Sequence, residues 1–217
     1  MTASPSPLPV LPDPRLATGV QRLARRWAGH YGADTIRELV ADSYQRLAGS
    51  ARVRGHLVAL AERLTAERLD ALAHSETAPA HRPPRVLFVC SHNAGRSQLA
   101  AALLTLRAGG RVTVSSAGTH PAAEVEPEVA RLLAEAGLPP GDAYPKPLTD
   151  EILRAADIVV TMGCGDACPV IPGPRYLDWP VADPDGAPAE TVRAIRDEID
   201  AHITGLLATL APAGPGA

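Results

Sequence analysis

Hydrophobic residues recur every three or four positions over the first third of the chain, a pattern that predicts three amphipathic helices. The apolar positions of the three helices are, in turn, Leu16, Val20, Leu23 and Trp27; Ile36, Leu39, Val40, Tyr44 and Leu47; and Val53, Leu57, Leu60 and Leu64. Thr35 followed by Glu38 fits a capping box at the start of the second helix, and Gly49 suits its end. Because the connections are short, we expect residues 15–73 to form a small antiparallel three-helix bundle.

A different pattern begins at residue 85, where short Val-rich runs alternate with helical periodicity. The strand candidates are 85–90, 111–118, 157–162 and 175–179, and the helix candidates are 95–108, 124–137, 148–155 and 188–210. This alternation predicts parallel βαβ units, so we expect an α/β domain over residues 85–210 with an open sheet and helices on both faces. Segment 74–84 is expected to be a proline-bearing linker, and segments 1–14 and 211–217 to be tails.

Composition narrows the class of protein without selecting a function. The net charge of -3 gives no general reason to expect nucleic acid or a membrane surface as a partner. No apolar run approaches the roughly 18 residues of a membrane span, and the first residues lack the pattern of a secretory signal. We therefore expect a cytoplasmic protein, whose three cysteines serve catalysis or redox chemistry and not a disulfide framework.

The segment CSHNAGRS, residues 90–97, links the first strand candidate to a helix. Ligands of open parallel sheets bind beyond the carboxyl ends of the strands, which is where Cys90 lies. Backbone N–H groups of such a loop, together with the positive end of the helix, form a receptor for a tetrahedral oxyanion. Gly95 allows a close turn, and Arg96 supplies a fork that can hold two anion oxygens. The same positive field favours a thiolate, so Cys90 is the predicted nucleophile.

The other loop residues are expected to support this chemistry. Ser97 is placed to donate a hydrogen bond to the thiolate, and Asn93 to hold the shape of the loop. The predicted substrate-binding residues are Ser91, His92, Asn93, Ala94, Gly95, Arg96 and Ser97. A nucleotide-binding loop is excluded, because GxxxxGK[ST] is absent.

The reaction also needs an acid to protonate the leaving oxygen. Asp183 lies in DWPVADPDG, on the loop after the fourth strand candidate, and this loop opens at the same edge of a parallel sheet as Cys90. Asp183 is therefore the predicted general acid, with Asp178 and Asp185 as competitors. Trp179 is expected to anchor this loop.

Four segments in this order, VLFVCSHNAGRSQLA, SSAGTHP, ADIVVTMGCGDACP and DWPVADPDG, resemble the signatures of the low-molecular-weight phosphatase superfamily. More narrowly, they resemble the arsenate reductases of its thioredoxin-coupled branch, over about residues 85–210. The resemblance implies a four-stranded parallel sheet, with Cys90 and Arg96 in the anion loop and Asp183 as the acid. The N-terminal helices resemble a three-helix module fused to such reductases in some bacteria, which implies a possible homodimer.

Phosphatases and reductases share the anion loop, so other residues must separate them. Cys164 and Cys168, just after the third strand candidate, provide the paired thiols that a two-electron reduction needs. The tyrosine phosphatases of the superfamily carry an aromatic residue where this chain has Asp185, and usually a proline where it has Gln98. These features favour an arsenate reductase, with a low-molecular-weight protein tyrosine phosphatase as the alternative.

The resemblance implies a relay of three cysteines. The Cys90 thiolate attacks arsenate, and Asp183 helps water to leave. Cys164 then attacks the Cys90 sulfur and releases arsenite, and Cys168 attacks Cys164, which moves the disulfide toward the surface. Thioredoxin or a similar dithiol reduces it there, and no bound cofactor or metal is expected. Gly163 and Gly165 would permit the segment around Cys164 to move.

Two features depart from the family pattern. Only three residues separate Cys164 from Cys168, so their disulfide would close a small loop. Some relatives carry a glutamate in the loop helix at a potassium ion, whereas residues 98–101 here read Gln-Leu-Ala-Ala, which argues against that ion site. A reducing route through a low-molecular-weight thiol would need only Cys90, and Cys164 and Cys168 argue against it.

Two rival interpretations belong to other classes of protein. A metal site could use Cys90, Cys164, Cys168 and His92, but paired Cys-x2-Cys spacing is missing and Arg96 would repel a cation. A DNA-reading helix could use Arg52, Arg54, Arg63 and Arg68, but interspersed acidic residues favour a solvated helix. His120 and His202 are expected to be ordinary surface or packing residues, and Lys146 an exposed loop cation.

Overall fold

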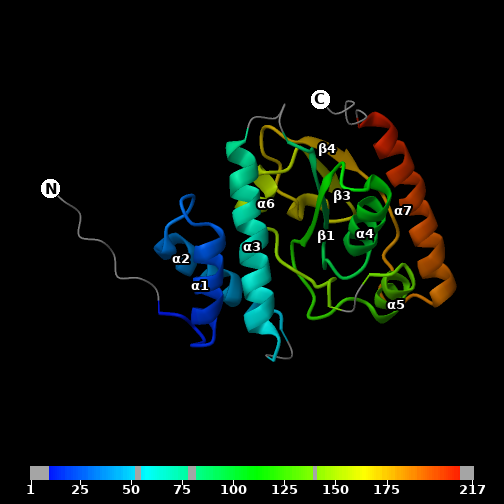
Figure 1. Cartoon of the computed structure of the whole chain (residues 1–217). Coiled ribbons are helices and arrows are strands. Elements are labelled where there is room, and N and C mark those ends of the chain that lie inside the picture. The colour runs from blue at the N-terminus through cyan, green and yellow to red at the C-terminus, as the bar shows by residue number, and fades with distance from the viewer. Residues whose placement is uncertain (1–9, 52–54, 78–81, 139–140, 211–217) are drawn as a thin grey trace. The chain divides into compact units, whose positions relative to one another are not determined.

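The chain forms two compact units, Met1–Asp70 and Ala71–Ala217, in a computed structural model (Figure 1). The structure describes residues 10–51, 55–77, 82–138 and 141–210. Arg52, Val53 and Arg54 therefore lie outside the described residues.

The first unit contains α1 (Leu16–Arg26), α2 (Ala33–Ala48) and most of α3 (Leu57–Glu76). The predicted apolar faces make its core, which includes the buried Leu16, Leu23, Ile36, Val40, Leu47, Leu57 and Leu64. The predicted capping box is wrong: Gly32 is the N-cap of α2, so the helix begins before Thr35, whereas Gly49 is the C-cap as expected. Helix α3 continues to Glu76, three residues into the segment predicted as a linker.

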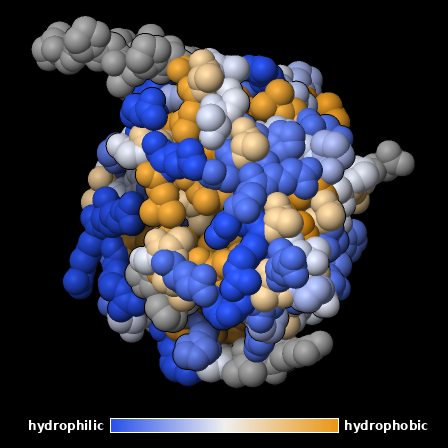
Figure 2. Space-filling model, turned by 90° about the vertical axis from the view of Figure 1, so that its right-hand side faces the viewer, coloured by the Kyte–Doolittle hydropathy of each residue, from blue (hydrophilic) through white to orange (hydrophobic). Residues whose placement is uncertain are grey.

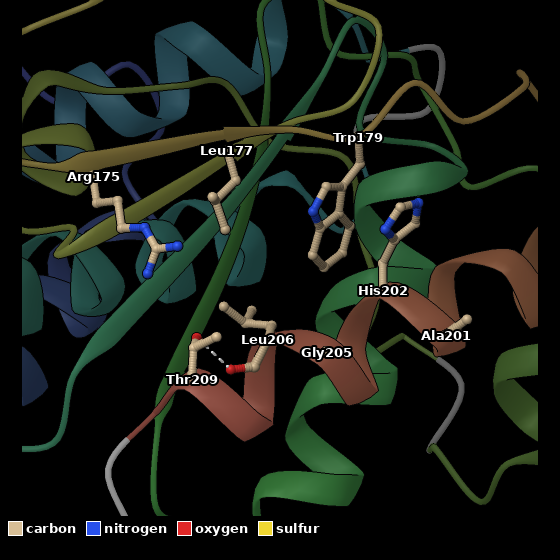
Figure 3. A pocket seen from close by; sticks show the side chains of 8 residues that line it. All are labelled: Arg175, Leu177, Trp179, Ala201, His202, Gly205, Leu206 and Thr209. Carbon is tan, nitrogen blue, oxygen red and sulfur yellow. Dashed lines mark hydrogen bonds between the residues drawn. The ribbon is translucent and has the colours of Figure 1, made fainter.

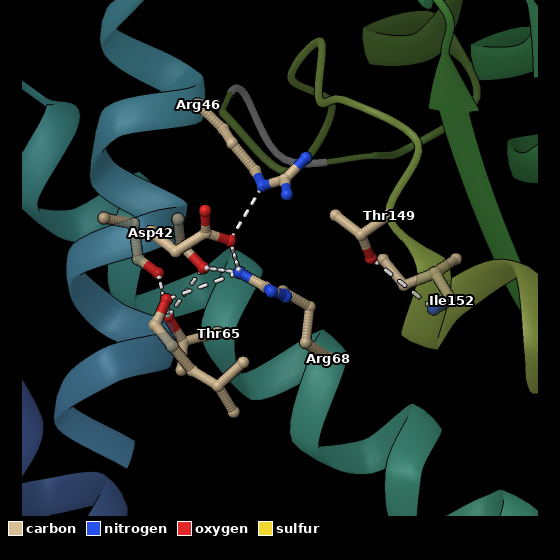
Figure 4. A network of polar contacts seen from close by, with 9 residues as sticks. Asp42, Arg46, Thr65, Arg68, Thr149 and Ile152 are labelled. Carbon is tan, nitrogen blue, oxygen red and sulfur yellow. Dashed lines mark hydrogen bonds and ion pairs between the residues drawn. The ribbon is translucent and has the colours of Figure 1, made fainter. Parts of the chain in front are cut away.

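A polar network crosses the core of this unit (Figure 4). Arg68 is 4% exposed, and its Nη1 donates to Asp42 Oδ2 at 2.7 Å and to Ser43 Oγ at 2.9 Å. Thr65 Oγ1 donates to the same Ser43 oxygen at 3.1 Å, and Arg46 Nε donates to Asp42 at 2.7 Å. A buried guanidinium needs such partners. Arg68 therefore belongs to the core. The sequence prediction of a solvated face is wrong for this residue, and Arg68 does not lie on a DNA-reading face either.

The second unit is built on a four-stranded sheet with the order β2-β1-β3-β4. Its strands are β1 (Arg85–Cys90), β2 (Thr113–Gly118), β3 (Ile158–Thr161) and β4 (Arg175–Asp178), and every pairing is parallel. Cys90 pairs with Gly118, Val89 with Thr161, and Thr161 with Asp178, so the carboxyl ends of the strands meet at one edge. The predicted open parallel sheet is confirmed.

Helices cover both faces of this sheet (Figure 1). Helices α4 (Arg96–Ala108), α5 (Pro127–Glu135) and α7 (Ala189–Thr209) lie on one face, and the short α6 (Asp150–Arg154) lies on the other. The main core joins the first face to its helices and includes Val86, Phe88, Leu99, Leu104, Leu132, Ile199 and Ile203. This packing fixes the end of β1 and the start of α4, between which the CSHNAGRS loop runs.

The opposite edge of the sheet is held by Asp157, just before β3. It accepts hydrogen bonds from both terminal nitrogens of Arg82 at 2.9 Å and from the Arg85 N–H at 2.7 Å. Burial would raise the pKa of Asp157, but these hydrogen bonds bring it below its usual value. His74 Nε2 lies 3.4 Å from Asp157, and burial together with Arg85 and Arg82 lowers the pKa of His74 to about 4.

The surface beside α7 mixes small apolar groups with hydrophilic residues (Figure 2). Among the helices of the described residues, none is both long and apolar enough to cross a bilayer.

Candidate active site

The loop between β1 and α4 is held from within by Asn93. Its φ of 48° is the one positive φ among the described non-glycine residues, a conformation that asparagine tolerates. Its Nδ2 donates to Ser97 Oγ at 2.8 Å, and its Oδ1 accepts from Gln98 Nε2 at 3.1 Å and from the Lys146 N–H at 3.0 Å. The expected role of Asn93 in shaping the loop agrees with these bonds.

Cys90 is a free thiol, 2% exposed, at the end of β1, where the loop that leads to α4 begins. The Asn93 N–H donates to its Sγ at 3.2 Å, and Ser97 Oγ lies 3.0 Å from the same sulfur. Because the Ser97 oxygen already accepts from Asn93, its hydroxyl proton is free to point at the sulfur. The Cys90 sulfur therefore has two hydrogen-bond donors beside it.

Arg96 is 6% exposed and faces the loop that follows β4. Its Nη2 lies 2.5 Å from Asp183 Oδ2, whereas its buried Nε has no hydrogen-bond partner. Gly163 packs against the guanidinium so closely that a Cβ there would collide with Nη1. An anion oxygen bound in the loop would give the unpaired Nε a partner, so the arrangement fits an oxyanion receptor.

Asp183 contacts the anion loop through Arg96. It is the carboxylate paired with Arg96, while Asp178 accepts from Thr161 Oγ1 at 2.6 Å and the Asp185 N–H caps Asp183 Oδ1 at 3.3 Å. Pro184 packs directly on Gly95, where a Cβ would overlap the proline ring. Gly95 has a φ of -132°, so its importance lies in this close approach and not in the tight turn predicted.

Cys164 and Cys168 form a disulfide just after β3, with Cα atoms 5.8 Å apart. Cys164 is 7% exposed, and its Sγ lies 3.8 Å from the carbonyl oxygen of Val89, next to Cys90. Cys168 is half-buried and lines a cavity of about 580 Å³. The cavity is also lined by Gly163, Val170, Tyr176 and Asp178. The structure therefore brings the second and third cysteines to the edge that holds the first.

The anion loop and the cysteine segment are also in direct contact. Ser91 Oγ donates to the Gly163 carbonyl at 3.1 Å, and Gly163 and Gly165 both have positive φ, at 73° and 51°. Within the described residues, no cluster of three or more His, Cys, Asp or Glu is placed to hold a metal ion. The rival metal site is further weakened because Cys164 and Cys168 bind each other and His92 is exposed.

Sequence reasoning missed the importance of two charged residues, Lys146 and Glu126. Lys146 is 7% exposed and not a surface cation; its Nζ lies 4.7 Å from the centre of the Tyr144 ring. The backbone of Lys146 bonds to Asn93, so this segment supports the anion loop. Glu126 donates its N–H to the Ala94 carbonyl at 3.0 Å. Neither residue belongs to a recognisable motif, and no local signal could have found them.

Trp179 anchors the acid loop, as expected. It is 6% exposed, stacks on His202 with ring centroids 4.8 Å apart, and accepts at its carbonyl a bond of 2.8 Å from Val181. A cavity of about 280 Å³ lies between β4 and α7 beside this pair (Figure 3). Its lining includes none of the predicted site residues.

Two family models match the chain. Residues 16–73 match the N-terminal domain described as protein-tyrosine-phosphatase-like, and residues 85–214 match the low molecular weight phosphotyrosine protein phosphatase model. The chain belongs to the low molecular weight phosphatase family. The match spans the sheet, the anion loop, the cysteine pair and the acid loop.

Relatives within the low molecular weight phosphatase family include reductases and phosphatases. A solved thioredoxin-dependent arsenate reductase from Corynebacterium glutamicum is 45% identical, with a TM-score of 0.79, over 90% of this chain and 96% of that one. A putative arsenate reductase of Halobacterium salinarum is 36% identical over 124 residues, 55% of this chain and 87% of that protein. An arginine phosphatase from Geobacillus stearothermophilus is 31% identical, with a TM-score of 0.51, over 59% of this chain and 93% of that one.

Proposed function

We propose that this chain is an arsenate reductase, in which the Cys90 loop binds arsenate and Cys164 and Cys168 carry the oxidation away. The observation that carries the proposal is the gathering of all three cysteines at one edge of the sheet, beside Arg96 and Asp183. The 45% identity to the C. glutamicum arsenate reductase, over most of both chains, supports the same activity.

The first step forms a covalent bond to arsenic. The Cys90 thiolate attacks arsenic, an S–As bond forms, and one As–O bond breaks. The leaving oxygen departs as water after Asp183 supplies a proton. Arg96 exchanges its contact with Asp183 for the anion oxygens, and its buried Nε gains a partner.

The second step is the reduction itself. The Cys164 thiolate attacks the Cys90 sulfur, an S–S bond forms, and the S–As electron pair stays on arsenic, which leaves as arsenite. Cys168 then attacks Cys164, and Cys90 returns to a free thiol. The structure has a free Cys90 and a Cys164–Cys168 disulfide. In the proposed cycle this is the oxidised enzyme, before the reductant reacts with it.

The reductant in this proposal is thioredoxin or a similar dithiol protein. Thiolate exchange depends on access to the attacked sulfur, and Cys168 is half-buried beside an open cavity whereas Cys164 is 7% exposed. Val170, two residues beyond Cys168, is 78% exposed and offers an apolar contact. The reductant's thiolate therefore attacks Cys168, and its second thiol resolves the mixed disulfide.

The test compares two activities of the same proteins. Arsenate turnover is measured with thioredoxin, thioredoxin reductase and NADPH, and hydrolysis is measured with p-nitrophenyl phosphate, for wild type and for Cys90→Ser, Cys164→Ser and Cys168→Ser. All three variants are expected to lose multiple turnover of arsenate, while only Cys90→Ser loses hydrolysis. Full arsenate turnover by Cys164→Ser or Cys168→Ser would rule out the relay. Robust hydrolysis by the wild type without arsenate turnover would indicate the phosphatase alternative.

Three expectations from the sequence stay predictions. They are the domain limits 15–73 and 85–210, the homodimer formed through the N-terminal helices, and the cytoplasmic location. Sedimentation of the full chain would test the second of these.

A further inference from the structure

The segment that follows Cys168 is held by a tyrosine of the sheet. Tyr176 lies on β4, which pairs in parallel with β3. Its hydroxyl accepts a hydrogen bond from the Ile171 N–H at 3.1 Å and donates one to the Pro169 carbonyl at 3.2 Å. One phenol oxygen thus bridges the two ends of segment 169–171 and ties that segment to the sheet.

The backbone around this segment has no other hydrogen bonds to hold it. Among the described residues, no backbone–backbone hydrogen bond involves positions 169–174. Three of these six residues are prolines, which have no N–H to donate. The position of segment 169–171 therefore depends on the two bonds of the Tyr176 hydroxyl.

Segment 169–171 borders the disulfide that a reductant has to reach. Cys168 directly precedes it and is half-buried, and Val170 in its middle is 78% exposed. Cys168, Val170 and Tyr176 line the same cavity of about 580 Å³. A protein whose thiol reaches Cys168 therefore also meets Val170, an apolar side chain of the kind that anchors the centre of a protein interface.

We propose that Tyr176 is a positioning residue, which holds segment 169–171 so that Cys168 and Val170 are presented together to a dithiol protein reductant. The reductant's first thiolate attacks the Cys168 sulfur, the Cys164–Cys168 bond breaks, and Cys164 leaves as a thiolate. The reductant's second thiolate then attacks the first reductant sulfur and releases Cys168, so two electrons pass from the reductant to this chain. The inference rests on the disulfide relay of the proposed function and adds the residue that prepares the disulfide for its reductant.

The test separates the two half-reactions of arsenate turnover in Tyr176→Phe, which keeps the ring and removes only the hydroxyl. In a ping-pong cycle, kcat/KM for arsenate reports the steps at Cys90, and kcat/KM for thioredoxin reports reduction of the disulfide. Docking on the variant must order a segment that the wild type already holds, so kcat/KM for thioredoxin should fall about tenfold. The value for arsenate should stay at that of wild type, whereas a general loss of folding would lower both.

A small dithiol and a second variant separate docking from access to the sulfur. Dithiothreitol needs no docking surface, so it should reduce the oxidised Tyr176→Phe protein at the wild-type rate. Val170→Ser should also lower kcat/KM for thioredoxin, and the loss in the double variant should be smaller than the product of the two single losses. Tyr44→Phe, which removes a hydroxyl from a buried tyrosine of α2, is the control and should match wild type.

The contradicting outcomes differ from those that contradict the proposed function. Wild-type kcat/KM for thioredoxin in Tyr176→Phe, equal slowing with thioredoxin and dithiothreitol, or losses that multiply in the double variant would each overturn the inference alone. If thioredoxin fails to reduce the disulfide of the wild type, the proposed function fails at its reductant, and the inference fails with it.

Discussion

Gly95→Ala should disable the acid loop while leaving the nucleophile in place. The new Cβ would overlap Cγ of Pro184 and lie 3.2 Å from its Cδ. Carbon atoms settle about 3.5–4.0 Å apart, so the proline, and Asp183 beside it, must move by roughly 1 Å. A displacement of about 1 Å can cost on the order of 100-fold in rate, and loss of a general acid about 100- to 10,000-fold. We therefore expect kcat for arsenate to fall roughly 100-fold.

The assay is steady-state arsenate turnover with the thioredoxin system, for wild type, Gly95→Ala, Asp183→Asn and the double variant. Because Gly95→Ala acts through Asp183, the double variant should be little slower than Asp183→Asn alone. Gly205→Ala is the matched control, since a Cβ at this position of α7 meets nothing within 4 Å and the backbone there does not have a positive φ. Wild-type kcat in Gly95→Ala, or two losses that multiply in the double variant, would refute the reasoning.

Two further predictions concern anion binding and acid stability. Gly163→Ala forces a Cβ into Arg96 Nη1 at a φ of 73°, so binding of inorganic phosphate, measured by calorimetry, should weaken about tenfold or more; unchanged affinity would contradict the packing described. His74 keeps a pKa of about 4 when folded against 6.5 unfolded, so only the unfolded chain binds its proton between these values and stability falls as pH drops from 6.5 toward 4. At 1.36 kcal/mol per pH unit, the loss between pH 6.5 and pH 5 amounts to about 2 kcal/mol. Urea unfolding at pH 7.5 and 5 should therefore show a smaller loss of stability for His74→Gln than for wild type; parallel losses would argue against it.

The sequence alone was sufficient where function follows from short-range order. A strand, an anion loop and a helix come in direct succession, so Cys90 and Arg96 could be placed without knowing the rest of the fold. The parallel sheet then brings every strand end to one edge, which is why Cys164 and Asp183 could be assigned to the same site from separate motifs. The structure has both beside the loop.

Other features depend on packing between distant segments, which no local pattern records. Arg68 occupies a helix position that could equally be exposed to solvent. Only the fold shows that its guanidinium is buried and hydrogen-bonded to Asp42 and Ser43. Lys146 lies in a short proline-flanked stretch that resembles an exposed loop until its backbone is seen to hold Asn93. Glu126 differs from the many other acidic residues in that its N–H donates to the Ala94 carbonyl, in the anion loop.

The relay of oxidation from Cys90 to Cys164 is tested most directly by a single turnover of reduced Cys168→Ser. The protein is mixed with one equivalent of arsenate and no reductant, quenched in acid, and digested without reduction for mass spectrometry, while arsenite is counted separately. We predict one arsenite released per chain and a Cys90–Cys164 disulfide. Intact thiols on both cysteines and no arsenite, in protein that still hydrolyses p-nitrophenyl phosphate, would contradict the account.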